Sequence, residues 1–117
     1  MRMSAAEYRQ TSKRNKYGAK KTTLDGITFD SKAEARYYAA LKQREKAGEV
    51  HSVELQRPYV LAVDGFLIAT YKADFSFWDQ VEERQRVIDV KGVVTPVFRL
   101  KQKMMKAIYG IDIEVVK

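Results

Sequence analysis

The sequence predicts an α/β fold, a central mixed sheet flanked by helices in the order helix, three strands, helix, strand. Residues 31–47 and 96–109 have apolar side chains at helical spacing. Between them, in residues 53–91, apolar and polar side chains alternate as in half-buried strands. A last short strand is predicted at residues 111–116. With 117 residues and 45% hydrophobic content, the chain has enough apolar material for a single core.

The chain begins with a basic segment. Residues 1–23 carry seven arginines and lysines against one acid, Glu7, which is a net charge of +6 out of +7 for the whole chain. We interpret residues 1–23 as a flexible arm that binds phosphate, with a solvated tail as the alternative, and residues 24–117 as one domain. The arm residues expected to contact nucleic acid are Arg9, Lys13, Arg14, Lys16, Lys20 and Lys21.

Turn and capping signals define the first elements of the domain. Asp25-Gly26 is typical of a tight hairpin turn, and Gly48 is a suitable end for the helix at residues 31–47. Ser31 and Glu34 have the spacing of a capping box, in which the glutamate reaches back to the serine amide. Glu34 could instead lie on a helix face that meets the sheet and add a carboxylate to a site there.

The next three strands are predicted at residues 53–63, 66–78 and 86–91. Asp64-Gly65 is the first turn between them, and the polar stretch at residues 79–84 is the second. These two turns predict two successive hairpins, so the three strands are expected to pair as antiparallel neighbours.

Asp74, Asp89 and Lys91 form the candidate catalytic site. If the second hairpin is centred between residues 81 and 82 without a bulge, Asp74 lies directly across from Asp89, at about 5 Å between Cβ atoms. Asp74 then points away from the apolar face, and the period of two places Lys91 on the same face as Asp89. The alternative is a surface cluster in which Lys91 merely neutralises two solvated aspartates.

Two carboxylates and an ammonium suit the hydrolysis of a phosphodiester. Mg²⁺ is held by one or two carboxylates and keeps several waters, and it can polarise a phosphoryl oxygen and activate a water. Lys91 would orient that water or stabilise the developing negative charge. Gln56, on the preceding strand, could reach the same site, although such a residue is more often just the outward side of a strand.

The second helix is predicted to begin at the cap Thr95, with Pro96 in its first turn, and to end at Gly110. Its inward residues are predicted to be Val97, Leu100, Met104, Ala107 and Ile108. Lys101 and Lys103 could extend the basic surface for nucleic acid, although any soluble helix has a charged outer face.

The candidate site residues and three longer sequence stretches resemble those of a known family. Asp74 followed by Asp89-Val90-Lys91, with Glu34 on a preceding helix, resembles the PD-(D/E)XK nuclease superfamily. The likeness is greater to small phage-encoded members with the stretches Asn-Lys-Tyr-Gly, Ile-Thr-Phe-Asp-Ser-Lys-x-Glu-Ala and Thr-Pro-Val-Phe-x-Leu-Lys, here at residues 15–18, 27–35 and 95–101. The chain departs from the superfamily motif by having Ala73 in place of proline and aspartate in place of glutamate at position 89. Neither change removes a ligand.

The resemblance covers most of residues 15–117 and implies a restriction-endonuclease-like core and a Mg²⁺- or Mn²⁺-dependent DNA endonuclease. Asp74 and Asp89 would be metal ligands, Glu34 a further ligand and Lys91 the catalytic lysine. A phage origin would place the protein in the cytoplasm of a bacterial host. A Holliday-junction resolvase of the same fold is an alternative, and it would require a homodimer. A second alternative is a non-catalytic basic module that binds nucleic acid.

Two absences in the sequence narrow the function classes. The chain has no cysteine, which excludes disulfides and thiolate metal sites and is consistent with a reducing cytosol. No run is long and apolar enough for a signal peptide or a membrane helix, so we expect no membrane partner.

Overall fold

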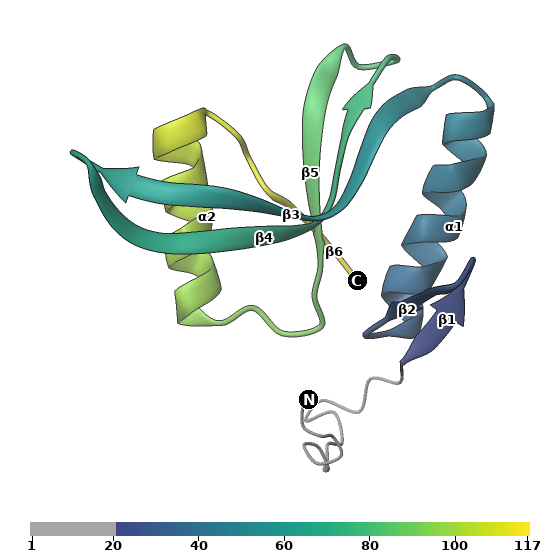
Figure 1. The fold of residues 1–117 in the computed structure, drawn as a ribbon, viewed down its shortest axis with the longest axis horizontal. Helices are drawn as coiled ribbons and strands as arrows, with labels where there is room; N and C mark the ends of the chain where they lie inside the picture. Colours follow the sequence, from purple (N-terminus) through teal and green to yellow (C-terminus); the bar gives the residue numbers. More distant parts are fainter. Residues whose placement is uncertain (1–20) are drawn as a thin grey trace. The chain divides into compact units, whose positions relative to one another are not determined.

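The computed structural model describes residues 21–117, which divide into two compact units, one ending at Tyr38 and one spanning Ala39–Lys117. The first unit holds the hairpin of β1 (Thr22–Leu24) and β2 (Ile27–Phe29) and the start of α1 (Lys32–Lys46). The second holds the rest of α1 and then β3 (Val50–Val63), β4 (Phe66–Asp79), β5 (Arg84–Val90), α2 (Pro96–Tyr109) and β6 (Glu114–Val116) (Figure 1). The predicted order of helix, three strands, helix and strand is confirmed. That residues 24–117 act as one domain stays a prediction.

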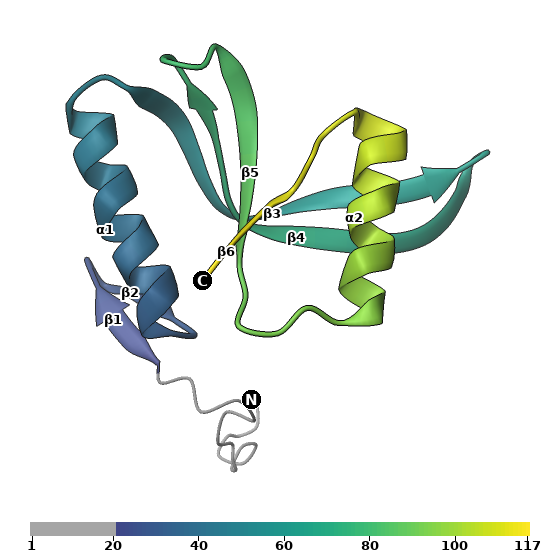
Figure 2. The ribbon, with the colours of Figure 1, turned by 180° about the vertical axis from the view of Figure 1, so that it is seen from behind.

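Four strands of the second unit form a mixed sheet in the order β3-β4-β5-β6. All neighbours are antiparallel except β5 and β6, which are parallel and are joined through α2, as a parallel pair requires a crossover. β4 pairs with β5 only from Phe75 to Asp79, so its first half pairs with β3 alone. Figures 1 and 2 show this part of the β3–β4 hairpin as a long, bent ribbon that crosses α2.

Both two-residue hairpin turns occur where they were predicted. Asp25 and Gly26 have φ angles of 53° and 75°, and Asp64 and Gly65 have φ angles of 50° and 83°. Positive φ at both central residues matches the right-handed twist of the flanking strands, which explains the Asp-Gly sequence at each turn.

The hairpin between β4 and β5 has the predicted register. Phe75 pairs with Ile88, and the same register carried one residue further sets position 74 opposite position 89. The fully buried Asp79 fixes the turn, because its Oδ1 accepts a hydrogen bond from the Val81 amide at 2.9 Å. Its Oδ2 accepts one from Arg86 at 3.0 Å. The turn geometry therefore determines which residues of β4 and β5 meet at the candidate site.

The predicted serine cap of α1 is confirmed. Ser31 Oγ accepts a hydrogen bond from the backbone N–H of Glu34 at 3.1 Å, so one of the otherwise unpaired amides of the first turn is satisfied. Glu34 itself is only 7% exposed. The helix ends at the predicted glycine, since Gly48 has a φ of 76° and donates to the Glu45 carbonyl at 3.0 Å.

α2 also begins and ends as predicted. Thr95 Oγ1 accepts from the Phe98 amide at 3.1 Å, Pro96 is the first helical residue, and Gly110 ends the helix with a φ of 70°. No helix within residues 21–117 is long and apolar enough to cross a lipid bilayer.

The predicted inward face of α2 is wrong except for Met104, which packs against the core; Ala107 and Ile108 are exposed. Val97 and Leu100 are 63% and 56% exposed, whereas Phe98 and Met105 are buried against the sheet. Lys101 and its neighbour Gln102 are half-buried on the inward side. A pattern that assigns every polar residue to solvent therefore selects the wrong face, because a lysine can bury its stem while its ammonium stays in a polar environment.

The core between α2 and the sheet is formed by buried side chains from β3, β4, β5, α2 and the segment before β6. They are Tyr59, Leu61, Tyr71, Ala73, Val87, Phe98, Met105 and Ile113. The face of β4 and β5 that meets α2 is thus packed, not solvated, and the candidate site lies at its edge.

Candidate active site

β4 and β5 bring the two predicted carboxylates together. Asp74 lies where β4 begins to pair with β5, and its Oδ2 accepts from the Val90 amide at 2.8 Å. Asp89, in β5, is only 3% exposed. The alternative of two solvated aspartates is therefore wrong for Asp89, because α2 covers the face on which it lies.

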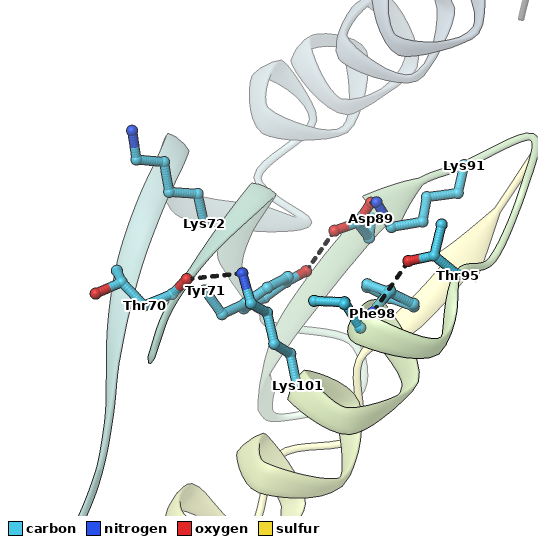
Figure 3. A pocket seen from close by; sticks show the side chains of 9 residues that line it. Thr70, Tyr71, Lys72, Asp89, Lys91, Thr95, Phe98 and Lys101 are labelled. Carbon is cyan, nitrogen blue, oxygen red and sulfur yellow. Dashed lines mark hydrogen bonds and ion pairs between the residues drawn. The ribbon is translucent and has the colours of Figure 1, made fainter. Parts of the chain in front are cut away.

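Lys91 lies beside Asp89, as the period of two predicted. Its Nζ is 3.3 Å from Asp89 Oδ1 and 4.5 Å from the centroid of the Phe98 ring, so a carboxylate and an aromatic face hold the ammonium together. The Lys91 backbone N–H donates to the Val116 carbonyl at 2.9 Å, which ties this end of β5 to β6. The parallel strand and α2 thus fix the lysine from two sides (Figure 3).

Tyr71 is a site residue that the sequence analysis missed. Its hydroxyl donates to Asp89 Oδ2 at 2.6 Å, and the residue is 3% exposed (Figure 3). Burial, followed by the bond to Asp89, raises the pKa of the Tyr71 phenol, which therefore stays protonated as a donor. Strict alternation places positions 71 and 74 on opposite faces of a flat strand, but the β3–β4 hairpin is bent (Figures 1 and 2).

Gln56 occupies the position across from Asp74 on β3. Its Nε2 donates to Asp74 Oδ1 at 3.2 Å, so the amide orients a carboxylate directly. Gln56 has a φ of 55°, a left-handed conformation that costs a non-glycine residue roughly 1–2 kcal/mol. Strained residues occur often at functional sites, and the predicted role of Gln56 in the site stays a prediction.

The two aspartates repel each other. Burial, followed by the negative charge of Asp89, raises the pKa of Asp74 to about 6, although hydrogen bonds from Val90 and Gln56 and the charge of Lys91 oppose the shift. A divalent cation between the carboxylates would remove this repulsion.

We expect the stability of the metal-free protein to fall as pH rises from about 4 to about 6. The folded state keeps a proton on Asp74 up to a pKa of about 6, whereas the unfolded chain releases it near 3.8, so rising pH favours unfolding in this window. The loss is at most about 3 kcal/mol, since each pH unit corresponds to about 1.4 kcal/mol. Melting curves recorded in chelator at a series of pH values should show this loss of stability for the native chain. The stability of Asp74→Asn should depend less on pH, by the same amount. Parallel curves for the two proteins would contradict the shifted pKa.

If Asp74 and Asp89 hold a metal ion, Tyr71→Phe should lower its affinity. It removes the donor to Asp89 Oδ2 and leaves that oxygen buried, and losing a partner that orients a ligand typically costs about 10–100-fold in affinity or activity. Tyr59→Phe is the matched control, because Tyr59 stacks on Tyr71 at 6.4 Å but bonds Ser76. Calorimetry with Mn²⁺ measures the metal affinity of both variants, and melting curves measure their stability, so the two effects can be separated. Equal losses of stability with equal metal affinities would reduce Tyr71 to a core residue.

The donor set fits a hard divalent cation. Each oxygen of Asp74 and Asp89 has one protein partner and keeps a lone pair, and Mg²⁺ needs only one or two carboxylates because waters and substrate oxygens complete its shell. Within residues 21–117, no group of three or more acidic, histidine or cysteine side chains is arranged to hold a metal. Glu34 belongs to the other unit, so its predicted role as a third ligand stays a prediction.

The predicted nucleic-acid contacts are only partly described. Lys21 and Lys103 are exposed, and Lys101 is half-buried, with its Nζ donating to the Thr70 carbonyl at 3.1 Å. The other predicted arm contacts lie outside the described residues; they are Arg9, Lys13, Arg14, Lys16 and Lys20.

Comparisons with known proteins place the chain in a family without assigning it a function. No curated protein and no solved structure matches it. A family described as "Protein of unknown function (DUF1064)" matches residues 14–115, a range that includes every residue of the candidate site. Because the match spans most of the chain, this protein belongs to the DUF1064 family.

Proposed function

We propose that this protein is a metal-dependent DNA endonuclease with a restriction-endonuclease-like core. The observation that carries the proposal is the cross-strand pair Asp74 and Asp89, with Lys91 Nζ 3.3 Å from Asp89. The mixed sheet with its helix, three strands, helix, strand order supports it, as does the resemblance of the Asp74 and Asp89-Val90-Lys91 pattern to PD-(D/E)XK nucleases. A module that only binds nucleic acid needs neither a pair of adjacent carboxylates, one of them buried, nor a lysine held against that one.

The side chains have separate tasks in this mechanism. Asp74 and Asp89 would hold Mg²⁺ or Mn²⁺, oriented by Gln56 and Tyr71. When bound, the cation supplies Lewis-acid activation of the phosphodiester and of the attacking water. The Lys91 ammonium orients the water or stabilises the negative charge that develops on the phosphoryl oxygens.

The reaction is a hydrolysis. The water oxygen bonds to phosphorus while the bond from phosphorus to one bridging oxygen breaks. The water loses a proton to solvent, and the departing oxygen takes one up. One strand end then carries a phosphate and the other a hydroxyl.

Purified protein should therefore nick or cut plasmid DNA in Mg²⁺ or Mn²⁺ and be inert in excess chelator. The same assay with a four-way junction and a matched linear duplex, alongside the mass in solution, distinguishes a general endonuclease from a resolvase. A monomer that cuts both substrates equally excludes the resolvase, whereas a dimer specific for the junction would replace the general endonuclease. DNA binding without cleavage under all metal conditions would leave only the binding module.

Glu34→Gln should lower activity and leave stability nearly unchanged, if Glu34 is a metal ligand. Glutamine keeps the geometry of the capping box, while the variant loses the negative charge. Ser31→Ala is the control, because it removes the hydroxyl that caps the Glu34 amide and should cost about 1 kcal/mol of stability without removing a ligand. Full activity in Glu34→Gln combined with a lower melting temperature would make the residue structural only.

A further inference from the structure

A pocket next to Asp89 contains a cationic group that the hydrolysis itself does not use. The pocket has a volume of about 360 Å³ and lies between β4, the end of β5 and the first turns of α2 (Figure 3). Its lining residues are Thr70, Tyr71, Lys72, Asp89, Lys91, Thr95, Val97, Phe98 and Lys101. A volume of this size is at the lower end for ligand sites and is far larger than a single water requires.

The charges in the pocket favour an anion. Lys91 and Lys101 line it together with only one carboxylate, Asp89, and that carboxylate already contacts Lys91 and the Tyr71 hydroxyl. Lys72 also borders the pocket, but its side chain extends away from Asp89 and Lys91 (Figure 3). Asp89 therefore compensates the charge of Lys91 but not that of the Lys101 ammonium.

Lys101 is held in place by a neutral partner. Its Nζ donates to the Thr70 carbonyl at 3.1 Å, and no ion pair of Lys101 occurs among the described residues. An ammonium has three donors, so two remain for a ligand. The side chain is half-buried on α2, so part of the entropic cost of ordering a lysine is already met before a ligand binds.

Thr95 and two apolar residues complete the pocket. Thr95 Oγ1 accepts from the Phe98 amide at 3.1 Å, which leaves the hydroxyl proton available to donate to an anion. Val97 and Phe98 form the apolar side of the pocket.

We propose that this pocket binds a phosphate group of the DNA strand through Lys101 and Thr95, next to the phosphodiester that is cut, an inference that rests on the nuclease function above. The pocket adjoins Asp89 and Lys91, so a strand positioned for cleavage places another of its phosphates within reach of Lys101. That phosphate is either an internal phosphodiester or a terminal phosphate, and both present the same anionic oxygens to the same two donors.

Phosphate binding is tested first without metal or cleavage. Inorganic phosphate titrated into the native protein in chelator should shift the amide NMR signals of residues 95–101, and Lys101→Gln should abolish the shifts. Lys106→Gln is the matched control, because it removes the same charge from an exposed position on the same helix, where Lys106 pairs with Asp112. Shifts that persist in Lys101→Gln, or that are absent in the native protein, would overturn the pocket assignment whether or not the protein cuts DNA.

Cleavage kinetics then identify the source of the phosphate. Lys101→Gln should raise KM for DNA about tenfold, the effect of losing a hydrogen bond to a charged group, with kcat little changed, and Lys106→Gln should raise it less than about threefold. If the ligand is a terminal phosphate, removing it from the substrate raises KM for the native protein but not for Lys101→Gln. If the ligand is an internal phosphodiester, removing the terminal phosphate changes KM for neither the native protein nor Lys101→Gln. Equal KM effects of the two lysine variants would overturn the proposal, while a native protein that binds phosphate but never cuts DNA would refute the nuclease function alone.

Discussion

Asp74→Asn and Asp89→Asn should each abolish cleavage of DNA in Mg²⁺ and remove Mn²⁺ binding measured by calorimetry. Each change removes one of the two charges that would hold the cation. Asp112→Asn is the matched control, because its side chain is 76% exposed and pairs only with Lys106 across the surface. This control should retain native binding and turnover.

Lys91→Ala should give a different result from the aspartate variants. Metal binding should persist, because both carboxylates remain, whereas turnover should fall about 10²–10³-fold, the usual effect of removing a group that stabilises developing charge. Lys106→Ala is the control for the loss of a surface lysine. Melting curves should accompany both assays, since Lys91 also compensates the buried charge of Asp89. Native turnover in folded Lys91→Ala, or native Mn²⁺ binding in both aspartate variants, would remove the catalytic assignment.

The register of the site was predictable because local chemistry determines it. The length of the polar turn at residues 79–84 fixes where β4 and β5 meet, and the period of two then fixes the faces of Asp74, Asp89 and Lys91. The caps of both helices were predictable for the same reason. Ser31 and Thr95 each satisfy an amide within three residues, so no distant contact is needed to decide the helix start.

Features that depend on distant packing were not predictable. Which side of α2 faces the sheet depends on the fit of Phe98 and Met105 to the sheet, whereas the apolar pattern predicted Val97 and Leu100 as inward residues. Tyr71 bonds Asp89 from the half of β4 that does not pair with β5, in a hairpin that is bent (Figures 1 and 2). Bending changes which side chains share a face, and no local pattern in the sequence encodes its extent.

Truncation of residues 1–20 should weaken DNA binding strongly and make it much less dependent on salt. This segment carries Arg2, Arg9, Lys13, Arg14, Lys16 and Lys20 against Glu7. Each lysine or arginine that neutralises a phosphate contributes about 0.9 to the slope of log affinity against log salt on duplex DNA, so the slope should flatten by up to about 5. The cut leaves β1 intact, because that strand begins at Thr22.

We expect the salt dependence of DNA binding to come from the charge of the arm and not from the order of its residues. A protein with the arm residues shuffled keeps every charge and should retain the native salt slope, whereas replacement of the six basic residues by glutamine should behave like the truncation. Turnover at saturating DNA should change little in all three proteins, because Asp74, Asp89 and Lys91 lie outside the altered segment. A salt slope that survives both truncation and neutralisation would show that the phosphate contacts come from elsewhere, and α2 with Lys101 and Lys103 would be the next surface to neutralise.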